Sequence, residues 1–127
     1  MSTKPSGPVA SRLQGAWRYV GTTYDGKPRE DRGDHPPGII IYDPSGHMAV
    51  QIAPVRERRA GAPMSQFLAY FGTYSIDERA GTVTHHREGD LRADGEIDAV
   101  RQYRFESDRL ILNPVGSTQE IIWERIT

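Results

Sequence analysis

Short runs of alternating apolar and polar residues, separated by turns rich in glycine and proline, make up most of this sequence. No stretch sustains the 3.6-residue periodicity of a long amphipathic helix. Runs of this kind at regular spacing are typical of a β-sandwich or a β-barrel. We predict eight strands, at Gly15–Tyr24, Gly38–Tyr42, His47–Ala53, Tyr70–Ile76, Thr82–Glu88, Asp98–Glu106, Leu110–Asn113 and Thr118–Ile126.

Most connections between these strands are short. The clearest is Asp43-Pro44-Ser45-Gly46, a tight-turn sequence that joins the second and third strands in a hairpin. Eight strands joined in this way form an up-and-down meander, which closes naturally into a barrel. The predicted fold is therefore all-β: a single closed, eight-stranded, antiparallel up-and-down barrel. It has at most one short helix, near residues 65–70, with Ser65 as the N-cap.

The length and the net charge limit the kinds of partner that the chain can bind. Its 127 residues fit one domain, which we place at residues 12–127, after a disordered tail at residues 1–11. The net charge of −1 lacks the basic excess of proteins that bind nucleic acid. No apolar run approaches the ~20 residues of a membrane span. The chain has no cysteine, which fits a reducing compartment. We therefore expect a cytoplasmic protein that binds neither nucleic acid nor membranes.

Strand alternation predicts which side chains face the interior. In the sixth strand, Tyr103 and Phe105 share a face with Arg101, and this aromatic face belongs inside. In the last strand, Ile121 and Trp123 lie on the face opposite two glutamates and also point inward. A few polar groups on a largely apolar lining are typical of a small-molecule pocket.

The fourth and fifth predicted strands add a second set of side chains that face the interior. Pairing across their turn places His85 opposite Tyr74, with both side chains inside. A slip of one residue would instead bring His86 and Glu88 to the interior, because neighbouring side chains on a strand point to opposite faces.

Further local patterns point to a family. Gly15-Ala16-Trp17 resembles the G-x-W signature of lipocalins, and Arg125 matches the arginine that packs over that tryptophan in them. The chain resembles more closely the bacterial and fungal lipocalin-like domain family, a calycin-type β-barrel, over residues 12–127. The most specific segments are Tyr70-Phe71-Gly72-x-Tyr74 and Gly81-Thr82-Val83-Thr84-His85-His86-x-Glu88-Gly89.

This resemblance implies the barrel and an internal ligand, but it supplies no agreed catalytic residues. Some relatives lie near genes for small-molecule synthesis or breakdown, which implies a place in secondary metabolism. Similar barrels serve as carriers, and others as cofactor-free lyases, isomerases or cyclases.

The segment His85-His86-x-Glu88 is the most chemically suggestive part of the chain. Two adjacent histidines on a strand cannot bind one metal, and His86 with Glu88 supplies only two ligands. We expect no metal and no cofactor. His85 is either a hydrogen-bonded core residue or a general acid or base. Ser65 and Ser75 lack a nucleophile motif, and the sequence indicates no hydrolase triad.

Two functions fit these observations. The first is a cofactor-independent lyase, isomerase or cyclase acting on a small carbonyl or aromatic metabolite. His85 would move the proton, Arg101 would hold a negative oxygen and Tyr74 would orient the substrate, with His86 and Glu88 in reserve. The ligand would rest against Tyr103, Trp123, Phe105 and Ile121.

The alternative is a non-catalytic binder or carrier of a small hydrophobic metabolite. The polar inward cluster favours the enzyme, and the lack of a recognised catalytic constellation favours the binder. Either function has a small molecule as its partner. Whether the chain is a monomer or a homodimer is open at this stage.

Overall fold

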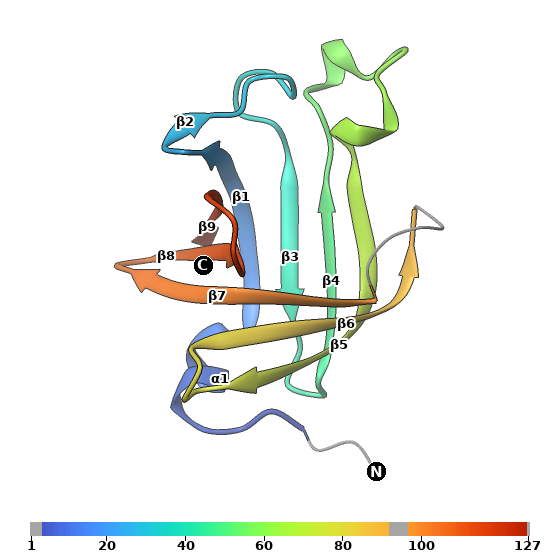
Figure 1. Ribbon diagram of the computed structural model, residues 1–127. Coiled ribbons are helices and arrows are strands. Elements are labelled where there is room, and N and C mark those ends of the chain that lie inside the picture. Colours follow the sequence, from blue (N-terminus) through green and yellow to red (C-terminus); the bar gives the residue numbers. More distant parts are fainter. Residues whose placement is uncertain (1–3, 92–96, 127) are drawn as a thin grey trace.

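The computed structural model of the protein describes residues 4–91 and 97–126 and consists mainly of antiparallel strands (Figure 1). Each strand pairs with a neighbour, and β1 also pairs with β9, so the sheet closes on itself. The short strand β2 pairs only with the end of β1, which leaves eight strands in the barrel. The predicted all-β barrel is thus confirmed. The strands are β1 (Gly15–Tyr24), β2 (Lys27–Pro28), β3 (Gly38–Tyr42), β4 (His47–Ile52), β5 (Leu68–Asp77), β6 (Thr82–Asp90), β7 (Asp98–Glu106), β8 (Arg109–Pro114) and β9 (Gln119–Arg125).

The turn between β3 and β4 shows how the sequence sets the local structure. The Asp43 carboxylate accepts a hydrogen bond from the Ser45 amide at 3.0 Å, and Gly46 takes a φ of 93°. Such a positive φ favours glycine. The turn brings Tyr42 opposite Met48 and starts a regular ladder between the two strands.

Strands β5 and β6 pair in the predicted register. Tyr74 lies opposite His85, and both side chains are buried. A bulge follows at Phe71 and Gly72, where the register shifts by one residue. An added Cβ on Gly72 would lie 1.9 Å from the carbonyl oxygen of His86, so the close approach of the two strands requires glycine here.

The helices differ from the prediction. At the site where a helical turn was expected, near residues 65–70, the chain forms a 3₁₀ turn at Met64–Gln66, and a second 3₁₀ turn lies at Arg56–Arg58. The α-helix is α1 (Pro8–Leu13), partly within the segment predicted as a disordered tail. Tertiary packing orders it: Leu13 is fully buried, and its carbonyl accepts a 2.8 Å hydrogen bond from the Trp17 indole.

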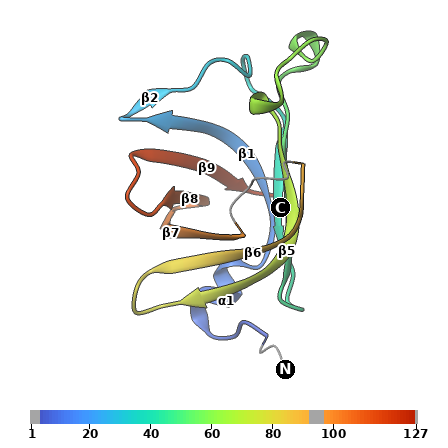
Figure 2. The same ribbon diagram turned by 45° about the vertical axis from the view of Figure 1, so that its right-hand side comes forward.

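The apolar core of the barrel begins at the end next to α1. Trp17, Leu110 and Leu13 belong to one buried apolar cluster, and α1 lies beneath this end of the strands (Figure 1, Figure 2). At the opposite end lie β2 and the segment that joins β4 to β5. No helix within residues 4–91 and 97–126 is long and apolar enough to cross a membrane. The connection between the predicted strands Thr82–Glu88 and Asp98–Glu106 falls largely outside the described residues.

Candidate functional site

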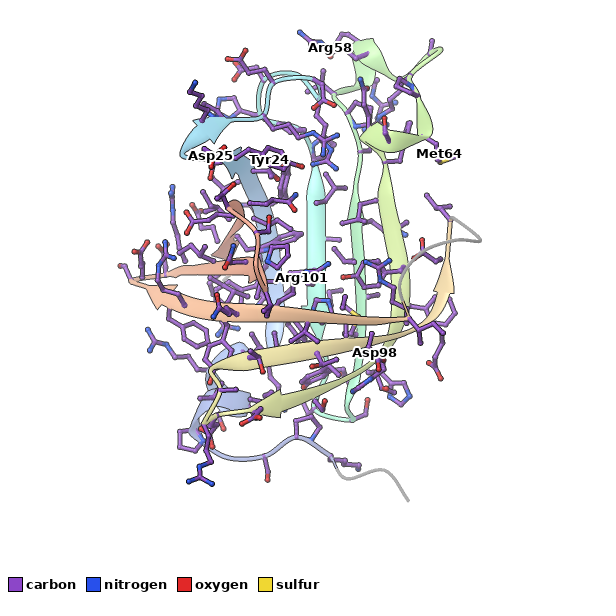
Figure 3. All side chains as sticks on the ribbon, viewed as in Figure 1. Tyr24, Asp25, Arg58, Met64, Asp98 and Arg101 are labelled. Atoms are coloured by element: carbon purple, nitrogen blue, oxygen red, sulfur yellow. The ribbon has the colours of Figure 1, made fainter. Side chains whose placement is uncertain are left out.

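A cavity of about 830 Å³ enters the barrel from the end opposite α1. This volume is within the range that holds a drug-sized molecule. The apolar side of the lining consists of Ile40, Val50, Ile52, Leu112, Ile121 and Trp123. Tyr24, near the upper end, and Arg101, on β7, both line the cavity and are labelled in Figure 3.

His85 lies fully buried between two tyrosines at the cavity. Its Nε2 is 2.5 Å from the hydroxyl of Tyr42, and its Nδ1 is 2.6 Å from the hydroxyl of Tyr70. Burial, followed by the positive charges of Arg101 and Arg87, lowers the pKa of His85 to about 3. The imidazole is therefore neutral at physiological pH.

A neutral imidazole has one N–H donor and one acceptor nitrogen, so its two tyrosines must play opposite roles. The hydroxyl of Tyr42 is buried, and within residues 4–91 and 97–126 its hydrogen-bond partner is Nε2 of His85. Tyr42 therefore donates to Nε2. Nδ1–H of His85 then donates to the oxygen of Tyr70, a cavity-lining residue.

Arg87 adds a positive charge beside this chain of hydrogen bonds. Its guanidinium lies 4.0 Å from the centre of the Tyr70 ring and forms a 2.8 Å ion pair with Asp90. Its Nε is buried with no hydrogen-bond partner within the described part of the chain, as is Nε1 of Trp123. Both residues line the cavity. An unsatisfied buried donor costs about 1–3 kcal/mol, so a ligand acceptor at either group would be favourable.

Two more arginines lie toward the upper end of the cavity. Arg32 is 5% exposed and donates to the carbonyl of Gln66 at 2.8 Å and to the hydroxyl of Tyr19 at 3.1 Å. Arg29 forms a bidentate pair with Asp31. Within residues 4–91 and 97–126, four guanidinium groups and three carboxylates line the cavity, so the described part of its lining has an excess of positive charge. The cations are Arg29, Arg32, Arg87 and Arg101, and the anions are Glu30, Asp31 and Asp90.

The structure brings only part of the predicted site together. His85, Arg101, Ile121 and Trp123 line the cavity. Tyr74 faces inward but lies nearer the lower end, where its hydroxyl donates to the carbonyl of Asp43 at 2.8 Å. Tyr74 is therefore not among the residues that line the cavity with His85 and Arg101, because alternation fixes the face of a side chain and not the direction in which it extends on that face.

Tyr103 and Phe105 are also outside this cavity. They are partly buried and pack against the apolar core, with their ring centres 5.8 Å apart. Phe105 also lies 6.4 Å from Trp17, near the lower end. Both residues were predicted to line the ligand cavity, but in the structure they contribute to the core of the barrel.

The reserve pair lies outside the barrel. Because β5 and β6 keep the predicted register, His86 points away from His85, and Glu88 is exposed beside the bulge. His86 forms hydrogen bonds to Ser75 and Asp98 on the neighbouring strands. No group of three His, Asp or Glu side chains within residues 4–91 and 97–126 is placed to hold a metal.

Four polar residues at His85 or in the cavity lining are not among the predicted site residues. Tyr42 and Tyr70 follow the same alternation that placed His85 inside, so the pattern could have identified them. Arg87 sits two residues after His85 on the same face. Arg32 comes from an irregular segment, where no periodicity marks a buried side chain.

The closed barrel and its polar internal cavity define a calycin-type protein of the kind that holds a small molecule inside. The chain belongs to the lipocalin-like domain family, whose profile matches residues 14–126. A DUF4847 family protein from Bacteroides vulgatus has a similar fold, with a TM-score of 0.57 at 14% identity over 94% of this chain and 98% of the other. A comparison with curated protein sequences finds no match.

Proposed function

We propose that the barrel binds a small organic anion with an apolar body. The observation that carries this proposal is the placement of Arg87 and Arg101 beside a neutral His85: both cations line the cavity, and both lower the pKa of that histidine. A carboxylate or an enolate oxygen fits a site that presents two guanidinium groups beside an uncharged imidazole. The apolar side, with Ile121 and Trp123, would contact the rest of the ligand.

A matched pair of fluorescent probes tests this proposal. Anilinonaphthalene sulfonate is an apolar anion, and N-phenylnaphthylamine is its uncharged counterpart. We expect the anion to bind in the cavity more tightly than the neutral probe. Arg101→Gln should lower the affinity for the anion about ten- to hundred-fold, the worth of a hydrogen bond to a charged group, and should leave the neutral probe almost unchanged.

Arg104 provides the control on the same strand. It points outward and pairs with Glu106 and Glu120. Arg104→Gln should leave the binding of both probes unchanged. Equal affinities for the two probes, or equal effects of the two arginine variants on the anion, would reject the anion site.

The chain of hydrogen bonds from Tyr42 through His85 to Tyr70 favours a second function on the same site: a cofactor-independent lyase, isomerase or cyclase acting on a small carbonyl or aromatic compound. With a pKa of about 3, His85 is a weak base. The base would then be the phenolate of Tyr70, held by Nδ1–H of His85 and by the guanidinium of Arg87. It would take the α-proton of the substrate and return one to the same carbon, while Arg101 stabilises the enolate.

Exchange of the α-protons of acetylacetone with heavy water, followed by proton NMR, separates the enzyme from the binder. An enzyme should accelerate this exchange, and Tyr70→Phe should reduce the rate about 10²-fold, at the lower end of the contribution of one acid or base. Binding of the sulfonate probe should survive that substitution. If the wild-type protein gives no more exchange than Tyr70→Phe, the enzymatic function is rejected and the binder is retained. The cytoplasmic location and the oligomeric state stay predictions.

A further inference from the structure

Three polar side chains form a hydrogen-bonded chain across the outer face of β5, β6 and β7. Nδ1 of His86 lies 2.9 Å from Oδ1 of Asp98, and Nε2 of the same ring lies 2.8 Å from Oγ of Ser75. Asp98 lies at the start of β7 and is labelled in Figure 3. The three residues are outside the cavity of the barrel, and the proposed binding site does not include them.

The groups that can donate and accept in these two hydrogen bonds determine where the protons lie. A carboxylate can only accept hydrogen bonds, so Asp98 requires a proton on Nδ1 of His86. A neutral ring then has a free electron pair on Nε2, and this nitrogen accepts the hydrogen bond from the hydroxyl of Ser75. A serine bonded to a histidine that is held in this tautomer by an aspartate is the arrangement that activates a serine for nucleophilic attack.

We propose that Ser75, His86 and Asp98 form an acyl-transfer site on the outer face of the barrel, acting on esters with a small apolar acyl group. Ser75 and His86 are the catalytic residues, and Asp98 is a positioning residue. Sequence reasoning found no triad because the three residues come from separate strands and meet only through the register of β5, β6 and β7.

The reaction balances without a cofactor. The Ser75 oxygen forms a bond to the ester carbonyl carbon, and its proton moves to Nε2 of His86. The bond from that carbon to the leaving oxygen then breaks, and the alcohol departs with the proton from His86. This leaves an acyl group on Ser75. Water repeats the two steps, which releases the carboxylic acid and restores the serine.

The residues around Ser75 indicate which esters the site accepts and limit the rate of hydrolysis. Val100 lies on the same outer face, opposite Thr84, which itself pairs with Ser75, and it is 38% exposed, so it offers an apolar contact to an acyl group. The backbone amides of the strands are engaged in the sheet. The developing oxyanion would therefore depend on the hydroxyls of Thr73 and Thr84, which alternation places on this outer face. We expect slow turnover of activated esters.

Hydrolysis of p-nitrophenyl acetate, together with mass spectrometry of the acylated protein, tests the proposal. The wild-type protein should carry an acetyl group on Ser75 and release nitrophenol. Ser75→Ala and His86→Asn should each lower the rate about 10²-fold, at the lower end of the range for general-base catalysis. Asp98→Asn should also lower the rate, because an amide can hold the ring in the wrong tautomer.

The chain contains its own control. Ser45 lies 2.9 Å from Nδ1 of His47 on an exposed turn. Within residues 4–91 and 97–126, His47 has no hydrogen bond to a carboxylate, so this pair lacks the third member. Ser45→Ala should leave the rate unchanged. Circular dichroism and thermal melting establish that each variant is folded. Ser75→Val, which removes the hydroxyl and suits a strand, replaces Ser75→Ala if the alanine variant does not fold.

Two results would overturn the proposal. The first is a rate that is equal in the wild-type protein, Ser75→Ala and Ser45→Ala, with no acyl group found on Ser75. The second is a rate that falls in His86→Asn and stays unchanged in Ser75→Ala, since the histidine would then react without the serine. Either result leaves the proposed binding function of the cavity untouched.

Discussion

The guanidinium carbon of Arg125 lies 4.0 Å from the centre of the Trp17 indole ring, at the end of the barrel that α1 covers. The two residues are also partners in the ladder that joins β9 to β1. Arg125 donates hydrogen bonds to the carbonyls of Gln14 and Arg12, next to the helix. A single side chain thus connects the closing strand, the first strand and the end of α1, as the resemblance to lipocalins implies.

Replacing Arg125 with Ala should therefore destabilise the barrel. The substitution removes a cation–π contact worth about 0.5–2 kcal/mol and leaves two carbonyls without their donor. We expect the free energy of unfolding to fall by about 2 kcal/mol in urea titrations. Arg18→Ala is the control, because the interaction of Arg18 within residues 4–91 and 97–126 is an exposed 4.0 Å ion pair with Glu124. Equal stabilities of the two variants would contradict this structural role of Arg125.

Gly72 gives a second test, at the bulge between β5 and β6. A methyl group there would lie 1.9 Å from a backbone oxygen of His86, and the backbone must shift to admit it. Gly72→Ala should lower the free energy of unfolding by about 2–3 kcal/mol, as for an overpacked interior. Gly21→Ala should change it by less than about 0.5 kcal/mol, since a Cβ on Gly21 meets nothing within 4 Å. Thermal or urea unfolding of the two alanine variants measures the difference, and similar values for both would contradict the close approach at Gly72.

The pKa of His85 predicts how stability depends on pH. An unfolded histidine takes up a proton near pH 6.5, while the folded protein resists protonation down to about pH 3. Stability from this group is therefore complete above pH 6.5 and is lost as the pH falls toward 3. By pH 4.5 the loss should reach roughly 2–3 kcal/mol, at 1.36 kcal/mol for each unit.

Carboxylates also titrate in this range, so the measurement is a comparison. The pKa values of Asp31 and Asp43 are lowered by hydrogen bonds from Arg29 and Ser45, and their protonation weakens the fold in acid as well. His85→Gln keeps a donor and an acceptor but cannot titrate. The difference in the free energy of unfolding between the wild-type protein and this variant should shrink or reverse between pH 6.5 and 4.5. A difference that stays constant with pH would mean that His85 is not protected from protonation.

The barrel could be predicted because its signals are local. Alternation and turn residues act over a few positions, and the ends of the strands differ from the prediction by at most two residues. Helix α1 could not be predicted in the same way. Six residues are too few to show a periodic pattern, and the burial of Ala10 and Leu13 exists only once the barrel is formed.

The candidate site was harder to predict, for a related reason. Alternation placed His85, Tyr74 and Tyr103 on the inner face, and all three lie on that face. Of the three, only His85 lines the cavity, because Tyr74 and Tyr103 pack into the apolar core. Arg32 reaches the cavity from an irregular segment, through bonds to Tyr19 and Gln66 that no sequence pattern indicates.

The last prediction concerns the tautomer of His85. If the proton were on Nε2, the oxygen of Tyr42 would accept it, and the buried hydroxyl proton of Tyr42 would lose its acceptor at a cost of about 1–3 kcal/mol. We therefore expect the proton on Nδ1, pointing at Tyr70. Nitrogen NMR of labelled protein distinguishes the two forms, because the protonated and unprotonated ring nitrogens have well-separated chemical shifts.

The two neighbouring tyrosines provide the check on this assignment. Tyr42→Phe removes the only hydroxyl that holds Nε2 among the described residues, so the proton on Nδ1 should lose its fixed position and the two tautomers should mix. Tyr70→Phe removes the acceptor of the Nδ1 proton but leaves the hydrogen bond from Tyr42 to Nε2 intact. The proton should therefore stay mainly on Nδ1 in this variant. If the wild-type spectrum places the proton on Nε2, both hydrogen bonds of His85 run in the opposite direction. Tyr70 would then donate to His85 instead of accepting from it, and its hydroxyl could not deliver a proton to a ligand in the cavity.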